Sequence, residues 1–421
     1  MPRRATLYEE LSVGTRLAIR TLIPPPQQRE PLRWNNFHRA FVYFIPFLFM
    51  AYLVRRAHTY PIRLLLLPTL ITSTIYSTYH FRVDDPSCVM LDWLRYMMAY
   101  YIISKSLNFG LTPGGRFKIG EKRLLDISET EHQPRGGKQS LLPTWLADAL
   151  EVTFVVRGFG WDFGKGVHAP PDSRSMERRT FLQATALSFF KNVFITDLSD
   201  SLLKLVPGVG SVKGGSIFKP ELPTYPRYTL STTIHIAGGT MVVCGLEACY
   251  DLATLIAVGL LGHSPPNWPP LFGGPWRASS LRELWGESWH QLLRHMFLIY
   301  GGYPGYWLGG RAGMVFGAFL ASGVFHALAL NIHDHRVILF FVMQAVGILA
   351  EVAWVRVTGR RVGGVVGWLW KSFFVLVMGQ MCVDAWAIGG FAGATLVPKR
   401  LSIVRQALFP VMRLVFQQPW Q

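Results

Sequence analysis

Charged residues and cysteines are scarce in this sequence of 421 residues. Asp, Glu, Lys and Arg make up 16% of it, against roughly 25% in a typical soluble domain, and the mean hydropathy is +0.25. The four cysteines show no CxxC spacing. They are too few for a disulfide framework and are typical of buried small hydrophobic residues. This composition excludes a disordered chain and argues against an ordinary soluble enzyme.

Acidic residues are also in the minority, with 25 Asp and Glu against 42 Lys and Arg, a net charge of +17. Such an excess commonly indicates nucleic acid or an anionic surface as partner. Here the basic residues cluster between long apolar runs, which predicts loops beside membrane lipid and an anionic ligand, and no nucleic-acid partner. The sequence has no Walker A, GxGxxG or zinc-finger pattern, so soluble nucleotide-binding folds have no support.

Nine apolar windows have lengths suited to a bilayer core of about 30 Å. They are Ala40–Val54, Ile62–Tyr79, Val89–Leu107, Phe181–Leu203, Tyr228–Leu261, Met296–Leu308, Met314–Leu330, Val337–Val355 and Val365–Phe391. The sequence therefore predicts an all-α polytopic membrane protein, a bundle of roughly 8–10 transmembrane helices with interfacial helices beside it. The window with Gly238-Gly239 fits one long helix or two broken ones. No internal repeat is evident, which disfavours an inverted-repeat transporter.

The sequence predicts a polar N-terminal arm at residues 1–39 and a single transmembrane domain at residues 40–421. The arm is interrupted by arginines and by the run Pro24-Pro25-Pro26, so we do not expect a secretory signal here. It contains one short amphipathic piece suited to the membrane surface. Long polar connections are expected at 108–144, 158–180 and 204–227. Positive-inside bias places the most basic of them in the cytosol.

The most informative segment is Trp268–Arg294. Four prolines just before and within its start prevent a continuous helix there. Ser279 or Ser280 is expected to cap the next helix, with Glu283 completing a Ser-x-x-Glu capping box. Bulky apolar residues then follow at helical spacing up to Trp289, which predicts an amphipathic helix at the membrane interface. His290 and Gln291 come next, at the edge of that helix.

A second site is expected on the helix Gly313–Leu330. A row of small residues spaced by four should let another helix approach closely: Gly309, Gly313, Gly317 and Ala321. His326 is the one titratable side chain in this otherwise apolar crossing, and such residues are functional candidates. A neutral imidazole suits general-base chemistry near pH 7. The alternative is a histidine that is only hydrogen-bonded within the bundle.

Together these segments resemble the fungal wax-synthase-like acyltransferases of the membrane-bound O-acyltransferase (MBOAT) superfamily, in the branch that acetylates terpenoids and meroterpenoids. The resemblance rests on Pro270-Leu271-Phe272-Gly273 with the run Ser280-Leu281-Arg282-x-x-Trp285-Gly286-x-x-Trp289-His290-Gln291-x-x-Arg294, on Ser322-Gly323-x-x-His326, and on Arg157-Gly158-x-Gly160-Trp161. It covers residues 157–326 by motif and the whole chain by helix layout.

The resemblance implies an acyl-CoA-dependent O-acyltransferase of secondary metabolism, acting on a hydroxyl of a lipophilic acceptor such as a terpenoid, with acetyl-CoA as the foremost co-substrate. His326 would be the general base. His290 stands where many members have Asn or Asp, so it either supports catalysis or only shapes the wall. The residues expected to contact substrate or CoA are Trp285, Trp289, Gln291, Arg282, Arg294, Ser322 and Asn331, with Lys371 a weaker choice.

A few sequence patterns could indicate other kinds of site or protein. His333-Asp334-His335 lacks the repeated histidine clusters of membrane di-iron enzymes, so we expect no metal. Asp197 and Asp200 lack the context of a prenyltransferase motif and suit an ion pair. No permanently bound cofactor is expected, and the sequence leaves the oligomeric state open. The protein is expected in the endoplasmic reticulum or another endomembrane. The alternatives are a long-chain wax or sterol ester synthase of the same superfamily, or a non-acylating transporter with a functional buried histidine.

Overall fold

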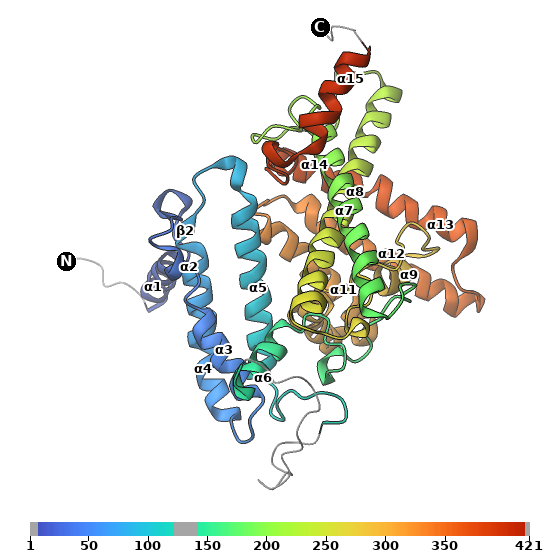
Figure 1. Cartoon of the computed structure of the whole chain (residues 1–421). Helices are drawn as coiled ribbons and strands as arrows, with labels where there is room; N and C mark the ends of the chain where they lie inside the picture. The colour runs from blue at the N-terminus through green and yellow to red at the C-terminus, as the bar shows by residue number, and fades with distance from the viewer. Residues whose placement is uncertain (1–6, 122–141, 417–421) are drawn as a thin grey trace, which may run out of the picture. The chain divides into compact units, whose positions relative to one another are not determined.

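The computed structural model describes residues 7–121 and 142–416, and these are helical almost throughout (Figure 1). This confirms the predicted all-α class. The chain divides into two compact units: Met1–Val167 with Leu292–Tyr300, and His168–Gln291 with Gly301–Gln421. The predicted arm at 1–39 and single domain at 40–421 stay predictions. Residues 1–6 of that arm, and 122–141 of the basic connection predicted at 108–144, lie outside the described residues.

The first unit is built on three apolar helices, of which α4 and α5 lie side by side (Figure 1). Its elements are α1 (Leu7–Leu22), β1 (Glu30–Pro31), α2 (Phe37–Ala40), α3 (Phe44–Val54), α4 (Tyr60–Tyr79), β2 (Phe81–Arg82), α5 (Met90–Gly110), α6 (Thr144–Phe154) and α10 (Arg294–Phe297). The two short strands pair in parallel, Glu30 opposite Phe81. Helix α1 buries no residue.

The Arg-Gly-x-Gly-Trp segment forms a tight turn in the core of this unit. Gly158 and Gly160 both have φ of 76°, a left-handed conformation that favours glycine. A Cβ on Gly158 would lie 2.8 Å from the Cα of Gly164, so no larger residue fits there. The turn buries Trp161 to 2% exposure beneath the guanidinium of Arg55. The segment therefore has a structural role in the first unit.

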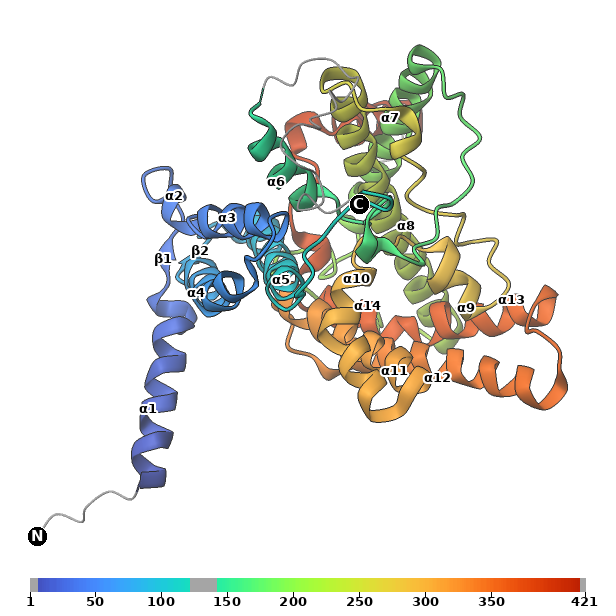
Figure 2. The same ribbon diagram turned by 90° about the horizontal axis from the view of Figure 1, so that it is seen from below.

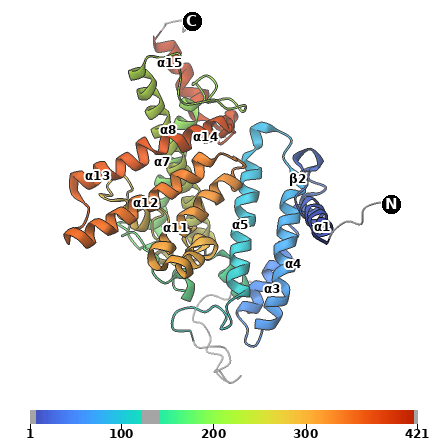
Figure 3. The ribbon, with the colours of Figure 1, turned by 180° about the vertical axis from the view of Figure 1, so that it is seen from behind.

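The second unit contains the remaining long helices. Its elements are α7 (Arg178–Leu203), α8 (Thr224–Thr254), α9 (Leu281–Glu283), α11 (Tyr303–Ala329), α12 (His335–Thr358), α13 (Gly364–Ser372), α14 (Gly379–Ile388) and α15 (Phe409–Phe416). Helix α7 packs along α8, and α11 packs along α12 (Figure 2, Figure 3). Helix α8 continues through a π-helical turn at Leu255–Leu260. The window with Gly238-Gly239 is thus one long helix.

Four segments among the described residues are long and apolar enough to cross a membrane: Thr224–Leu260, Arg294–Ala329, His335–Thr358 and Gly364–Ile388. They coincide with the predicted windows from Tyr228 onward. The earlier windows also fold as helices, namely α3, α4, α5 and α7, with bounds close to those expected. Whether those four also cross, as a count of 8–10 requires, stays a prediction.

The apolar stretch Arg294–Ala329 is not one helix but a hairpin. Gly309 has φ −143° and ψ 23°, and Gly310 has φ 57° and ψ −142°, so the chain leaves the helical conformation and reverses there. The two windows predicted on either side, Met296–Leu308 and Met314–Leu330, are its arms. Gly309 was expected in the small-residue row, and instead it forms the reversal, because a bend in a helix needs residues without Cβ.

Glycines from both arms of the hairpin meet at its centre. A Cβ on Gly301 would lie 2.0 Å from the carbonyl oxygen of Gly317, and a Cβ on Gly305 would lie 2.1 Å from that of Gly313. Ala321 also lies against Gly301. The predicted close approach along this row is therefore confirmed for its last three members, and the partner is the preceding arm of the same hairpin.

Helix α12 approaches α11 just before His326. A Cβ on Gly323 would lie 2.9 Å from the Cα of Ile338, so the two backbones are in contact at this glycine. Such small-residue contacts are the usual way in which membrane helices pack closely. The approach brings α12 side chains, among them Phe341, against the histidine.

Candidate active site

The segment before the site folds as the sequence predicts. Ser280 caps α9, because its Oγ accepts the backbone N–H of Glu283 at 3.0 Å, and the Glu283 carboxylate accepts the N–H and hydroxyl of Ser279, both at 2.8 Å. A second acid completes the cap. The buried carboxylate of Glu351 on α12 accepts the N–H groups of Leu281 and Arg282 at 2.7 and 3.0 Å. Helix α9 is thus fastened to α12 by its N-terminus.

The helix ends sooner than predicted. After Glu283 it widens into a π turn at Leu284–Ser288, and Trp289 is already extended, with φ −82° and ψ 152°. The amide Nε2 of buried Gln291 donates to the carbonyls of Trp285 and Trp289, at 3.1 Å each, and so satisfies groups that a continuing helix would bond. His290 and Gln291 therefore follow the turn and are not on the helix. Such π turns are frequent at functional sites.

Four aromatic rings run in contact from His290 to His326. Phe272 and Trp289 both touch His290, with ring centroids 5.6 and 5.4 Å away. Trp289 lies 5.4 Å from Trp285, and Trp285 lies 6.5 Å from Phe341. We call Phe272, Trp289, Trp285 and Phe341 the aromatic row. It places both predicted catalytic histidines along one continuous surface of the second unit.

The ring of His326 is held on several sides. It stacks on Phe341 with centroids 4.4 Å apart and planes at 19°, and Trp386 of α14 lies 6.2 Å away. Its Nδ1 lies 2.7 Å from the carbonyl oxygen of Ser322, one helical turn earlier. A carbonyl only accepts, so Nδ1 donates. In the neutral ring the lone pair is then on Nε2, which is the form that a general base requires.

One buried polar side chain supports the aromatic row. The indole Nε1 of Trp285 donates to the side-chain oxygen of Gln344 at 3.2 Å, and Gln344 on α12 is fully buried. Sequence reasoning missed both Gln344 and Glu351. The sequence did contain a signal for them, because both are polar residues within the apolar window Val337–Val355. A polar side chain in such a window indicates a functional or structural role, as a histidine does.

The other residues predicted to contact substrate or CoA lie on different elements. Arg282 is exposed on α9, while Arg294 belongs to the first unit. Asn331 is exposed and ends α11 in the left-handed region, with φ 54°. Ser322 is buried beside His326. The buried Lys371 donates to the carbonyl of Trp276 at 3.2 Å. Their roles toward substrate and CoA stay predictions.

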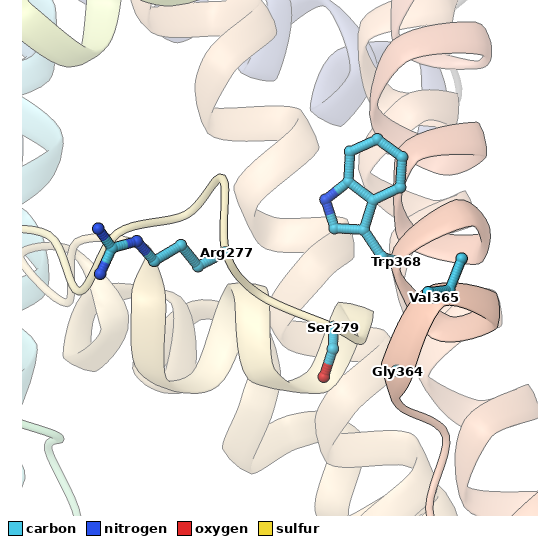
Figure 4. A pocket seen from close by; sticks show the side chains of 5 residues that line it. All are labelled: Arg277, Ser279, Gly364, Val365 and Trp368. Carbon is cyan, nitrogen blue, oxygen red and sulfur yellow. The ribbon is translucent and has the colours of Figure 1, made fainter.

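A shallow opening of about 410 Å³ lies where the loop before α9 meets the start of α13 (Figure 4). Figure 4 shows Ser279 beside Gly364, and Arg277 extending away from Trp368. Backbones touch here, since a Cβ on Gly367 would lie 2.1 Å from the carbonyl oxygen of Ser279. Arg277 is exposed and was not predicted, although it is a basic residue in the proline-rich run before the site.

Asp197 and Asp200, which were expected to form an ion pair, are both engaged in ion pairs. Asp200 on α7 bonds Lys204 and lies 3.2 Å from Nη2 of Arg405, and Asp197 accepts the hydroxyl of Ser402 at 2.6 Å. They fasten the C-terminal segment to α7. Within residues 7–121 and 142–416, no three His, Cys, Asp or Glu side chains are arranged to hold a metal ion.

The segment that builds this site also matches a known family. Residues 268–343 match the Membrane bound O-acyl transferase family, and they contain α9, the aromatic row and both histidines. Over this segment the chain is similar to that family. Among solved structures, none matches the chain.

Several curated fungal acetyltransferases are similar to parts of this chain. Acetyltransferase spyB of Aspergillus fumigatus is 35% identical over 27% of this chain and 22% of its own length. Acetyltransferase sirH of Emericella nidulans is 27% identical over 59% of this chain and 62% of its own. Acetyltransferase ple2 of Rhodocybe pseudopiperita is 28% identical over 58% and 63%. The match thus spans less than two thirds of each of these relatives.

Proposed function

We propose that this membrane protein transfers an acyl group, acetyl foremost, from acyl-CoA to a hydroxyl of a lipophilic acceptor such as a terpenoid or meroterpenoid. The observation that supports this proposal best is the setting of His326. This residue lies in an apolar helix, donates from Nδ1 to a backbone carbonyl, and stands at the end of an aromatic row formed by the family segment. The acetyl group is favoured by the names of the relatives.

In this proposal His326 acts as a general base. The acceptor oxygen attacks the thioester carbonyl carbon while Nε2 takes the hydroxyl proton. The tetrahedral intermediate then collapses, the carbon–sulfur bond breaks, and the CoA sulfur leaves with the proton returned by the imidazolium. The products are an ester and free CoA. The hydrogen bond from Nδ1 to Ser322 stabilises the imidazolium form during the step and keeps the ring oriented.

The same proposal assigns supporting roles to neighbouring residues. His290, in contact with Phe272 and Trp289, serves as a polar group near the reacting carbonyl. The exposed Arg282 is suited to ion pairs with CoA phosphates. For Arg294, which belongs to the first unit, binding of CoA phosphates stays a prediction. We place the protein in the endoplasmic reticulum or another endomembrane, where acyl-CoA and lipophilic acceptors meet.

The test is release of free CoA by purified protein in detergent, followed with a thiol reagent. We expect release from acetyl-CoA only when a hydroxylated terpenoid is present, and a loss of at least a hundredfold in His326→Ala. The matched control is His335→Ala, because the His335 side chain is 89% exposed. Full activity in a folded His326→Ala variant would remove the histidine from the mechanism.

The same assay separates the alternatives. Faster turnover with long-chain acyl-CoA than with acetyl-CoA would indicate a wax or sterol ester synthase. Substrate flux into proteoliposomes without thioester consumption would indicate a transporter.

A further inference from the structure

A cavity of about 650 Å³ with both polar and apolar lining residues lies between α7 and α8 in the second unit. This volume is in the range of small-molecule sites. We call it the α7–α8 cavity and define it by six of its lining residues: Lys191 and Asn192 of α7, and Thr240, Cys244, Glu247 and Asp251 of α8. The loop residues 270–272 and 274–276 line it too. None of these side chains has a part in the acyl-transfer step described above.

Four polar residues of α8 that line the cavity share one side of the helix. Thr240, Cys244, Glu247 and Asp251 follow each other at intervals of three and four, so they share one side of the helix. This side belongs to a segment that is apolar enough to cross a membrane. Carboxylates there are costly and are seldom kept without a function. Asp251 accepts a hydrogen bond from the amide of Asn192 at 3.3 Å, which joins the two helices across the cavity.

The charges in the cavity favour a neutral ligand over an anionic one. Arg174 also lines it, but its guanidinium is hydrogen-bonded to both oxygens of Asp172, at 2.9 and 2.6 Å. That pair leaves one ammonium, Lys191, with two carboxyl groups, Glu247 and Asp251. The cavity therefore has no excess of positive charge with which to bind the phosphates of CoA. A hydroxylated molecule would find both donors and acceptors here.

The cavity adjoins the candidate active site at Phe272. Phe272 lines the cavity, and its ring also contacts Trp289 at 5.1 Å and His290 at 5.6 Å. Its backbone N–H lies near the carboxyl group of Glu247. Phe272 therefore belongs to both the cavity and the aromatic row.

We infer that the α7–α8 cavity binds the acceptor alcohol at an entry site, holding its oxygen-bearing part with Lys191, Asn192, Thr240 and the two carboxyl groups before the hydroxyl passes Phe272 to reach His326. The ligand is a neutral, hydroxylated molecule of terpenoid size, and the acyl donor binds elsewhere. The inference rests on the proposed function, since it identifies the second substrate of that reaction. It also predicts binding that needs neither donor nor turnover.

Cys244 offers a direct test, because its thiol lines the cavity, while Cys249 on the same helix is exposed and does not line it. Alkylation of both thiols by N-ethylmaleimide is followed by peptide mass spectrometry in the full chain. We expect the terpenoid alcohols farnesol and sclareol to slow labelling of Cys244 at least fivefold and to leave Cys249 unchanged. The hydrocarbon farnesene and acetyl-CoA should protect neither.

A pair of threonine variants tests the cavity independently. Thr240→Val removes a hydroxyl from the cavity, and Thr233→Val removes one from the same helix outside it, where Thr233 bonds only the carbonyl of Thr229. We expect KM for the acceptor to rise at least fivefold in Thr240→Val alone, with KM for acetyl-CoA unchanged in both variants.

The labelling and KM experiments can each overturn the inference. Protection of Cys244 by acetyl-CoA, or by neither alcohol, would overturn the inference, as would equal acceptor KM values in the two threonine variants. If the alcohols protect Cys244 also in His326→Ala, and no ester forms with any variant, the proposed function fails while the cavity still binds alcohols. The two claims are therefore separable.

Discussion

Replacing Gly317 by alanine tests the glycine contact that holds the hairpin before the site. A Cβ at this position would lie 2.1 Å from the carbonyl oxygen of Gly301, whereas real Cβ contacts essentially never fall below 3.0 Å. The two arms must therefore separate by about 1 Å. The matched control is Gly238→Ala on α8, where a Cβ would meet nothing within 4 Å.

The size of the effect follows from two opposing terms. Alanine stabilises a helix by about 1 kcal/mol relative to glycine, in both variants. At Gly317 the separation of the arms costs a further 1–3 kcal/mol, by analogy with overpacked cores, because a gap of 0.5–1 Å forfeits roughly a quarter to a half of each dispersion contact. We expect Gly317→Ala to be about 1–3 kcal/mol less stable than Gly238→Ala.

Unfolding of the purified variants with SDS in mixed micelles would measure this difference. The reasoning also predicts a coupling. Gly301→Ala clashes with the carbonyl of Gly317 at 2.0 Å, so once either substitution has parted the arms the other costs little. The double variant should then be at least 1 kcal/mol more stable than the sum of the single effects. Equal stability of Gly317→Ala and Gly238→Ala, or strict additivity of the pair, would show that the arms are not in contact.

Three further substitutions test the supports of the two units, each by the same unfolding titration. Glu351→Gln should cost about 2 kcal/mol, because one of the two N–H groups at the start of α9 loses its carboxylate oxygen; an unchanged midpoint would contradict the cap. Trp285→Phe should cost about 1–3 kcal/mol by leaving the buried oxygen of Gln344 without the indole N–H, and adding Gln344→Leu should recover part of that loss. Burial alone raises the pKa of Glu121, but the hydrogen bonds and charge of Arg55 outweigh it and hold the pKa below its ordinary value. The pair therefore stabilises the protein above pH about 4.5, and the deficit of Glu121→Gln at pH 7 should vanish as the pH falls through the lowered pKa of Glu121.

Local patterns predicted several structural features around the site correctly. The capping box at Ser280 and Glu283 depends on residues three apart, and it forms as expected. The two apolar windows around Gly309 depend on length and on glycine, and both are arms of the hairpin. Composition and the apolar windows sufficed for the all-α membrane class. Each of these features is decided within one or two helical turns, where sequence spacing and structure are directly related.

Features that depend on pairing between distant segments were missed. Nothing in the run after Ser280 reveals that Glu351, about 70 residues later, will cap that helix. The shortening of the same helix depends on Gln291 turning back onto two carbonyls, which spacing cannot show. The polar face of α8 was visible as a periodic pattern around Glu247, but only the packing of α7 against α8 makes it a cavity.

The contacts of α11 explain why backbone packing, more than side chains, determines where His326 stands. On one side the preceding arm of the hairpin touches α11 at Gly317, and on another α12 touches it at Gly323. Both contacts are made by residues without side chains, which have no rotamers through which the helix could shift. The ring itself is then oriented from within its own helix, by the carbonyl of Ser322, and from α12 by Phe341. A base positioned by backbone contacts changes place when those contacts widen, so Gly317→Ala should lower kcat for acyl transfer while the acceptor KM, set at the α7–α8 cavity, stays near its original value.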